Sequence, residues 1–338
     1  MRVVLADPPA FTPPYDHALA AALARAGAEV ELVTSRFRFG ATAAPEGYEQ
    51  LELFYPLSSR LFRRSRLRLP LKALEHPFGL VRLARRPADV VHLQWLAAPE
   101  LDVRLLRILR PGRSAPLVFT AHDLLPRRTA AKAALWRKLF ARFERVVVHS
   151  NRGRESLAAF GIPNATLRVI PHPVFPGDVT RADDGSTVLA LGLVRPYKQL
   201  AHARKAVAAL PGARLVVAGD KQAFLPEAEI ERALAEATVA VFPYRAELDQ
   251  SGALLRALGA GVPAVVYDVG GLGELVTAYG AGRVVAPDDV AGLASALKEL
   301  LGDTAALAGA RAGALRAREE LTWDASAQAH LELYRELL

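Results

Sequence analysis

The stretch from 239 to 276 constrains the fold of this chain most, because it holds two apolar strands around one short helix. Val239–Phe242 and Ala264–Tyr267 are uninterrupted apolar runs, typical of strands buried on both faces of a parallel sheet. Ser251 suits the N-cap of the helix between them. The helix has an apolar face and ends at small residues: Leu254, Leu255, Leu258, Gly259 and Gly261. The pattern predicts a βαβ unit, and hence an α/β fold.

The loop before this helix is a candidate anion-binding site. In open parallel sheets, ligands bind beyond the carboxyl ends of the strands, where a helix N-terminus offers unpaired N–H groups. Gln250, Ser251, Gly252 and Ala253 occupy that position, and Gly252 would let a phosphate approach the backbone. The alternative is a plain βαβ unit in which Ser251 only caps the helix.

Composition indicates a two-domain α/β protein. The chain has 338 residues, of which 51% are hydrophobic and 23% charged, enough for two domains with separate cores. It has no cysteine, which excludes disulfides, thiolate metal sites and a cysteine nucleophile. Met1 and Arg2 lead directly into an apolar strand, and no long apolar run follows, so we expect a cytoplasmic protein without a signal peptide or membrane span.

The first half is expected to form one domain over residues 1–172. It opens with the strand Val3–Ala6, a proline-rich loop, a helix over His17–Ala26 and the strand Glu29–Thr34. Prolines stand where a dinucleotide-binding protein has G-x-G-x-x-G, so no nucleotide is expected at this loop. Two later apolar strands, over residues 89–95 and 117–121, each bring a histidine to the ligand edge of the sheet: His92 and His122, the latter followed by Asp123.

Residues 58–86 form a basic stretch that explains much of the net charge of +8. Glu75 is its one acidic residue, and leucine and phenylalanine alternate with nine cations: Arg60, Arg63, Arg64, Arg66, Arg68, Lys72, Arg82, Arg85 and Arg86. The pattern suits peripheral contact with an anionic membrane. The alternative is a pair of surface helices with solvated arginines. Nucleic acid is not expected as a partner, since aromatic residues are sparse in the stretch.

The second half is expected to form a domain over residues 187–322, after a linker at 173–186 rich in proline, glycine and aspartate. The strand Val188–Leu191 runs into a loop with Gly192, Arg195 and Lys198. An arginine fork and a lysine point charge in such a loop suit a diphosphate. Solvated surface cations are the alternative.

Several ordered motifs carry a family resemblance. QSGALL and ALGAGVPAVVYDVGGLGELV follow a Pro-Tyr pair in the second half, preceded by GLVRPYKQ, and the first half contains HDLLP and VVVHSNRGRESLAAFGIP. Together they resemble the retaining glycosyltransferases of family 4. The resemblance implies a GT-B fold, with two facing Rossmann-like domains, acceptor-side and donor-binding, and a last helix over 323–338 that packs back on the N-terminal domain.

The resemblance also implies residue roles. His122, Asp123, Lys198 and Arg195 correspond to catalytic positions. The donor-binding positions are Gly192, Arg195, Lys198, Gly219, Glu247, Gln250, Ser251, Gly252, Ala253 and Arg256. Tyr15 and Asp16 are acceptor candidates, with a proline-stiffened turn as the alternative. No cofactor or metal is expected beyond a nucleoside diphosphate sugar as co-substrate.

The chain departs from the family pattern at several places. Arg256 stands where many members have a ribose-binding glutamate, Gln199 stands where glycine is usual, and the base-binding segment after Gly219 is shortened. We therefore expect a metal-independent, retaining transferase that moves a sugar to an acceptor hydroxyl of a lipid-linked glycan or natural product. The alternative is a catalytically degenerate GT-B protein that acts as a partner or auxiliary binding module; a GT-B epimerase or phosphorylase is less favoured.

Overall fold

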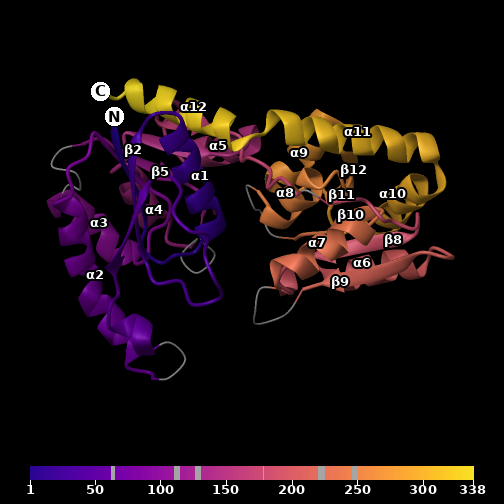
Figure 1. Cartoon of the computed structure of the whole chain (residues 1–338), viewed down its shortest axis with the longest axis horizontal. Helices are drawn as coiled ribbons and strands as arrows, with labels where there is room; N and C mark the ends of the chain where they lie inside the picture. The colour runs from indigo at the N-terminus through magenta and orange to yellow at the C-terminus, as the bar shows by residue number, and fades with distance from the viewer. Residues whose placement is uncertain (62–64, 110–114, 126–130, 178, 220–224, 246–249) are drawn as a thin grey trace. The chain divides into compact units, whose positions relative to one another are not determined.

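The computed structural model describes residues 1–61, 65–109, 115–125, 131–177, 179–219, 225–245 and 250–338, which form two compact units (Figure 1). The first unit contains Met1–Val148, Arg154–Ile170 and Trp323–Leu338, and the second contains His149–Gly153 and Pro171–Thr322. The described part of the expected linker therefore lies in the second unit, where Val174 is 1% exposed and its N–H donates to the carbonyl of Leu321 at 2.9 Å.

The first unit is built on a seven-stranded parallel sheet in the order β3-β2-β1-β4-β5-β6-β7. Its strands are β1 (Arg2–Asp7), β2 (Glu29–Ser35), β3 (Glu49–Phe54), β4 (Val90–Leu93), β5 (Leu117–Thr120), β6 (Arg145–Val148) and β7 (Leu167–Val169). This is a Rossmann-type order, and the direction of winding reverses between β1 and β4. A ligand is therefore expected beyond the carboxyl ends of these two strands.

Helices cover both faces of the first sheet. They are α1 (Pro13–Arg25), α2 (Arg68–Ala84), α3 (Pro99–Leu109), α4 (Ala133–Phe140), α5 (Asn151–Ala159) and α12 (Trp323–Arg335), with short 3₁₀ turns at Ser58–Leu61 and Asn164–Thr166. Alternate residues of β1 enter different cores: Val3 and Leu5 pack with α1 and α12, whereas Val4 and Ala6 pack with α2, α3 and α4. Burial on both faces explains the continuous apolar run of this strand.

The last helix packs within the first unit. Leu331 and Tyr334 of α12 belong to the same buried cluster as Leu19 and Leu23 of α1. Arg25 of α1 also pairs with Asp324 at 2.6 Å.

The second unit contains a five-stranded parallel sheet in the order β12-β11-β10-β8-β9. Its strands are β8 (Thr187–Leu191), β9 (Arg214–Ala218), β10 (Val239–Phe242), β11 (Ala264–Tyr267) and β12 (Gly282–Val285). Its helices are η4 (Pro196–Lys198), α6 (Leu200–Ala208), α7 (Glu227–Glu236), α8 (Gly252–Gly259), α9 (Gly270–Tyr279), α10 (Val290–Gly302) and α11 (Thr304–Glu320). The predicted unit β10-α8-β11 is confirmed, and the winding reverses between β8 and β10.

Three local predictions differ from the structure. Helix α1 starts at Pro13, four residues before the expected start, because prolines are tolerated in a first turn whose N–H groups need no helical partner. The basic stretch forms a 3₁₀ turn and one helix, α2, with Pro77 inside it, rather than two surface helices. Strand β3 was not predicted; its residues are only partly buried before Phe54, so its apolar signal is weak.

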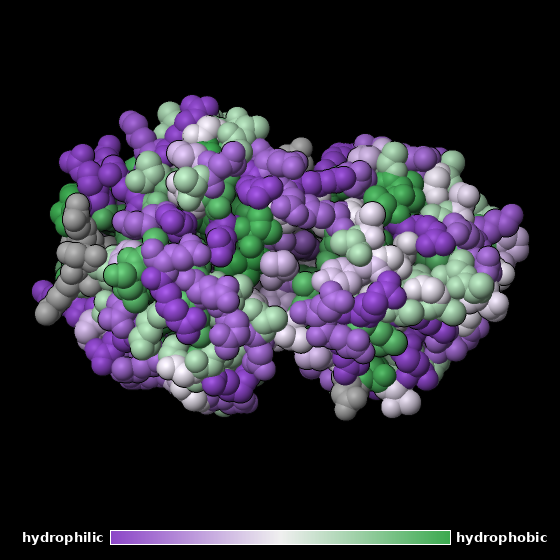
Figure 2. All heavy atoms as spheres, turned by 90° about the horizontal axis from the view of Figure 1, so that it is seen from above, coloured by the Kyte–Doolittle hydropathy of each residue, from purple (hydrophilic) through white to green (hydrophobic). Residues whose placement is uncertain are grey.

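The surface seen in Figure 2 is mostly hydrophilic, and hydrophobic atoms occur there in small groups. Among the described residues, no helix combines the length and the hydropathy needed to cross a bilayer.

Candidate functional site

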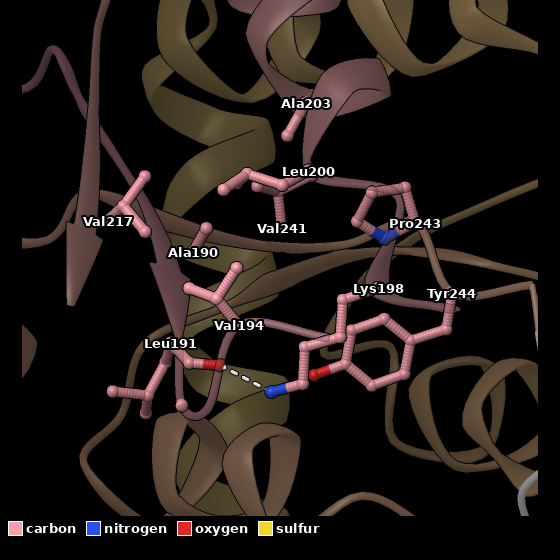
Figure 3. Close-up of a pocket in the computed structure, with 11 residues that line it drawn as sticks. Ala190, Leu191, Val194, Lys198, Leu200, Ala203, Val217, Val241, Pro243 and Tyr244 are labelled. Atoms are coloured by element: carbon pink, nitrogen blue, oxygen red, sulfur yellow. Dashed lines mark hydrogen bonds between the residues drawn. The ribbon is translucent and has the colours of Figure 1, made fainter. Parts of the chain in front are cut away.

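The second unit has a pocket at its switch point, between the carboxyl ends of β8 and β10 (Figure 3). Leu191 and Gly192 line it from β8, and Pro243 and Tyr244 line it from β10. Lys198 enters it from the turn η4. The pocket therefore lies where open parallel sheets of this winding bind ligands.

Gly192 lies at the centre of the predicted site. It has φ +90°, and a Cβ built on it would lie 2.9 Å from Lys198 Nζ and 3.5 Å from the Cβ of Ala253. A Cβ on Gly219, at the end of β9, would lie 2.1 Å from the carbonyl oxygen of Gly192. The fold thus brings Gly192, Lys198, Gly219 and Ala253 together, and close backbone approach requires glycine at 192 and 219.

Lys198 is held by two contacts within the described part of the unit. Its Nζ donates to the Leu191 carbonyl at 3.0 Å and lies 5.2 Å from the centroid of the Tyr244 ring. Burial, and secondarily the charge of Arg195, lowers the pKa of Lys198 to about 8. An ammonium with donors to spare in a partly desolvated pocket suits an anionic ligand.

The N-terminus of α8 reaches the same site. Ser251 is its N-cap, and its hydroxyl accepts from the N–H of Leu254 at 3.4 Å. No atom lies within 4 Å of a Cβ built on Gly252, so the first turn faces open space. Gln250 Oε1 is buried without a hydrogen-bond partner among the described residues. The first-turn N–H groups and the ammonium of Lys198 therefore supply donors suited to an anion, and we call this arrangement the cradle.

The other predicted donor residues are placed differently. Arg195 is exposed, and its Nη1 lies 3.5 Å from the carbonyl of Val194. Arg256 pairs with Glu227 of α7, and its guanidinium lies 5.2 Å from the centroid of the Phe175 ring. Gln199 has φ +44° and donates through Nε2 to Asp288 at 2.9 Å. Glu247 lies outside the described residues.

His122 lies at the carboxyl edge of the first sheet, just beyond β5. Its Nε2 is 2.9 Å from Gln94 Oε1, and its ring stacks on Trp95 with centroids 5.3 Å apart. Trp95 in turn donates from Nε1 to the hydroxyl of Thr12 at 2.8 Å. Asp123 follows His122 and is half-buried. A histidine beyond β5 is therefore oriented by an amide and a stacked indole that follow β4, next to the switch point of the first sheet.

Tyr15 and Asp16 are each only 2% exposed. Tyr15 packs edge-on against His122, with centroids 4.7 Å apart, and Asp16 lies in the first turn of α1. Burial, together with the charge of Asp7, raises the pKa of Asp16, which favours its protonated form. This burial favours the alternative interpretation, a structural turn beneath His122, and acceptor contact by either residue stays a prediction.

His92 has a structural environment. It is fully buried, with Nδ1 2.7 Å from the Tyr334 hydroxyl and Nε2 2.7 Å from the Thr120 hydroxyl. The sequence analysis did not single out Gln94 or Trp95 as site residues and named Tyr244 only within the Pro-Tyr pair, although each follows an apolar strand at the ligand edge. Within the described ranges, no three His, Cys, Asp or Glu side chains form a group that could hold a metal ion.

Two family models match the chain. Residues 15–176 match the model described as Glycosyltransferase Family 4, and residues 185–303 match the model described as Glycosyl transferases group 1. The two matches follow one another along most of the chain. No curated protein sequence is a significant match.

Solved structures similar to this chain include glycosyltransferases and synthases. Sucrose-phosphate synthase from Thermosynechococcus elongatus has a TM-score of 0.77 at 19% identity, covering 100% of this chain and 99% of that one. Anabaena HepE in complex with UDP-glucose has a TM-score of 0.73 at 18% identity, covering 100% of both chains. WaaG, a glycosyltransferase involved in lipopolysaccharide biosynthesis, has a TM-score of 0.67 at 15% identity, covering 98% and 99%.

Proposed function

The chain belongs to the glycosyltransferases, with a family 4 domain and a group 1 domain in a GT-B fold, and we propose that it transfers a sugar from a nucleoside diphosphate sugar to an acceptor hydroxyl. The second unit would bind the donor and the first unit the acceptor. HepE, a neighbour of the same fold, was solved with UDP-glucose, which supports a nucleotide-sugar donor here.

The observation that carries this proposal is the meeting of Lys198, Gly192 and the first turn of α8 at the switch point of the second sheet. A diphosphate in the cradle would accept from Lys198 Nζ and from the free N–H groups of that turn. These donors stabilise the negative charge that grows on the diphosphate as it departs. They require no metal ion, and we propose a metal-independent reaction.

We propose transfer with retention of configuration. The bond between sugar C1 and the diphosphate oxygen breaks, and the acceptor oxygen bonds to C1 on the same face. The acceptor proton passes to the departing diphosphate oxygen, so the cradle that holds the leaving group also holds the proton acceptor. His122 would line the sugar side of the acceptor unit, oriented by Gln94 and Trp95.

A thermal-shift screen over UDP-, GDP- and dTDP-sugars, followed by an assay for released nucleoside diphosphate, tests this proposal. A bound donor at a hundredfold its Kd raises the free energy of unfolding by about 2.7 kcal/mol. We expect one donor class to stabilise the protein and to be consumed. NMR of the product anomer then decides between retention and inversion.

The alternative is a degenerate protein that binds a partner without catalysis. Arg256 favours it, because a cation paired with Glu227 stands where many family members have a ribose-binding carboxylate. Failure of every donor to stabilise the protein, with no turnover, would favour this alternative over the transferase.

We also propose peripheral contact between helix α2 and an anionic membrane, at the cytoplasmic face. Four apolar side chains on or next to α2 are 68–70% exposed: Leu67, Leu69, Leu74 and Phe78. The exposed cations Arg60, Arg66, Arg82 and Arg85 accompany them. Lys72 and Arg86 do not belong to this solvated set, because Lys72 packs over Tyr55 and Arg86 pairs with Glu31; Arg63 and Arg64 lie outside the described residues.

Sedimentation with vesicles tests the membrane contact. Each basic residue near anionic headgroups contributes about 1 kcal/mol, and the attraction is screened within about 8 Å at physiological salt. Vesicles containing phosphatidylserine should therefore bind the protein at low salt and release it as salt rises. Arg60→Glu with Arg66→Glu should weaken binding. Equal binding to neutral phosphatidylcholine vesicles would contradict an electrostatic contact.

A further inference from the structure

The first unit contains a second pocket, with a cavity volume of about 210 Å³, beside the carboxyl ends of β1, β2 and β3. Four separate segments form it: the loop at 9–11, the end of β2 and its loop at 35–39, the turn at 55–59, and the start of α2. This is the ligand edge of a parallel sheet. Of the residues expected to be functional, only Arg68 and Lys72 of the basic stretch line it.

The pocket wall is strongly cationic. Arg36, Arg38, Arg68 and Lys72 line it, and among the described residues no aspartate or glutamate does. Nε and Nη2 of Arg38 are buried and have no hydrogen-bond partner among the described residues, and the same holds for the Oγ of Ser58, which is 1% exposed. Buried donors without partners are costly, especially on a charged group. Arg38 and Ser58 both line this pocket, so its cationic wall and unpaired donors suit an anionic ligand.

The carboxylates around the pocket already have other partners. Glu75 accepts the backbone N–H groups of Leu57 at 2.7 Å and Ser58 at 3.0 Å. Asp102 accepts from His76 Nε2 at 2.5 Å and from the N–H of Ala98 at 3.0 Å. Asp7 accepts the N–H groups of Phe11 at 2.7 Å and Thr12 at 3.1 Å through Oδ2, whereas its Oδ1 is buried without a hydrogen-bond partner among the described residues. These hydrogen bonds hold the surrounding scaffold in place, and none of them is made to the side chain of Arg38 or Lys72.

Lys72 is oriented by a chain of buried contacts that runs from Tyr55 through His76 to Asp102, called the relay below. Its Nζ lies 4.3 Å from the centroid of the Tyr55 ring. The Tyr55 hydroxyl is 2.7 Å from His76 Nδ1, and the opposite ring nitrogen of His76 is bonded to Asp102. Tyr55 has φ +55°, a left-handed backbone conformation that is unfavourable for a tyrosine. The relay holds the tyrosine in this conformation and so positions the ammonium above the ring.

The pocket is continuous with the His122 site through aromatic contacts. Phe11 lines the pocket and packs edge-on against Trp95, with centroids 5.3 Å apart. Trp95 then stacks on His122. An acceptor bound in the pocket would therefore extend along this wall toward His122.

We infer that this pocket binds a phosphate or diphosphate group on the acceptor, through Arg38, Lys72 and Ser58. The inference rests on the proposed function and names its acceptor class. Guanidinium forks match phosphate oxygens, lysine adds a mobile charge, and a hydroxyl adds a short donor. Phe11, Phe37 and Phe39 line the same pocket, so an organic phosphate fits it better than a bare ion.

The test measures binding of inorganic pyrophosphate by calorimetry in the Lys198→Ala background, where the donor cradle is disabled. Arg38→Gln and Ser58→Ala are the test variants, and Arg104→Gln, an exposed arginine of α3 outside the pocket, is the matched control. We expect Arg38→Gln to weaken binding at least tenfold, Ser58→Ala to weaken it less, and the control to bind as before. Pyrophosphate binding that Arg38→Gln leaves unchanged overturns the inference.

The unfolding midpoints of the two test variants show whether a loss of binding is caused by unfolding. Because Arg38 and Ser58 have buried donors without partners, their replacement should leave the unfolding midpoint of the free protein unchanged or raised. A variant that unfolds instead would mean that the pocket is a structural element, and it too would overturn the inference.

Two further arms identify the source of the phosphate. If a soluble hexose phosphate binds and this binding depends on Arg38, the acceptor is soluble. If Arg38-dependent binding is found only with phosphatidylcholine vesicles that contain 20% phosphatidic acid, the acceptor phosphate is carried by a lipid. Either supports the pocket. If phosphate binding depends on Arg38 but no sugar transfer is found, the proposed function is wrong and the phosphate pocket is supported. If sugar transfer is found but phosphate binding does not depend on Arg38, the phosphate pocket is wrong and the proposed function is supported.

Discussion

The ligand edges of the two sheets are built differently. In the second unit, backbone and glycine dominate: Gly192 and Gly219 bring strands within contact distance, and the free N–H groups of α8 face open space beside Lys198. In the first unit, side chains from separate segments dominate, with Trp95 stacked on His122 and arginines around a cavity. We propose that the backbone cradle binds the diphosphate common to all nucleotide-sugar donors, whereas a wall of side chains can be changed one residue at a time to suit one acceptor.

The largest effect is expected from Lys198→Ala, which removes the charged hydrogen-bond donor at the ligand edge of the second unit. The kcat should fall by about 10²–10³-fold, as when one preorganised donor to a developing anion is lost. Nucleotide should no longer raise the Tm of the variant, measured by thermal shift beside initial rates. Lys205→Ala, an exposed lysine on α6, is the control. Full protection of Lys198→Ala by nucleotide would show that the cradle is not the donor site.

A second prediction distinguishes a glycine required for close backbone packing, Gly219, from one that faces open space, Gly252. Gly219→Ala places a Cβ 2.1 Å from the Gly192 carbonyl oxygen, so we expect the free energy of unfolding to fall by about 1–3 kcal/mol. Gly252→Ala meets no atom within 4 Å and should leave stability unchanged or raise it by about 0.5–1 kcal/mol.

Urea unfolding with and without nucleotide checks both glycines. Although Gly252→Ala should fold well, its methyl group would occupy the approach to the α8 N–H groups, so its stabilisation by nucleotide should be smaller than that of wild type. Equal stabilisation of Gly252→Ala and wild type would mean that no phosphate comes close to the first turn of α8.

The contrast between the edges also explains what could be predicted from the sequence. The β10-α8-β11 unit and the Gly192–Lys198 loop are continuous in the chain, and a backbone cradle needs glycine, a capping serine and a lysine at fixed short spacings. These constraints remain visible in one sequence. The cradle residues that lie together in the structure, apart from Gly219, come from two such short segments.

The ligand edge of the first unit could not be predicted in the same way. Its pocket combines residues from four segments between positions 9 and 72, and their proximity depends on the strand order β3-β2-β1. One local signal was available: Arg36, Phe37, Arg38 and Phe39 directly follow the buried strand β2, where a ligand edge is expected. The density of arginines at 60–86 predicts a basic contact surface on α2 instead. Arg256 illustrates a further limit, because its pairing with Glu227 depends on the placement of α7.

A third prediction tests His122 at the first edge. His122→Ala should lower kcat by about tenfold or more, equivalent to about 1.4 kcal/mol. It should not change the Tm increase caused by nucleotide, because we propose that the other unit binds the donor. His92→Asn is the matched control, since both ring nitrogens of His92 are bonded inside the core and its loss should reduce stability rather than kcat. A wild-type kcat for folded His122→Ala would remove His122 from the reaction centre.

The smallest expected effect is a pH dependence that belongs to the second edge alone. Burial, with Arg195, lowers the pKa of Lys198 to about 8, so the free protein loses this charge as pH rises through 8. Only the ammonium pairs with a diphosphate, whose last proton is already lost near pH 6. The association constant for nucleotide should therefore fall above pH 8, by at most about tenfold per pH unit.

Stability of the free protein should change in the opposite direction. The lysine has its ordinary pKa of 10.5 when unfolded, so between pH 8 and 10.5 the unfolded chain binds more protons than the folded one. More protons on the unfolded state mean that the Lys198 contribution to the free energy of unfolding rises with pH in this window. Calorimetric titrations from pH 7 to 9.5 measure the affinity, and unfolding midpoints measure the stability. Lys198→Arg should abolish both slopes, because a guanidinium stays charged throughout. If this variant and wild type lose affinity in parallel, the titrating group is not Lys198, and the ammonium does not bind the diphosphate.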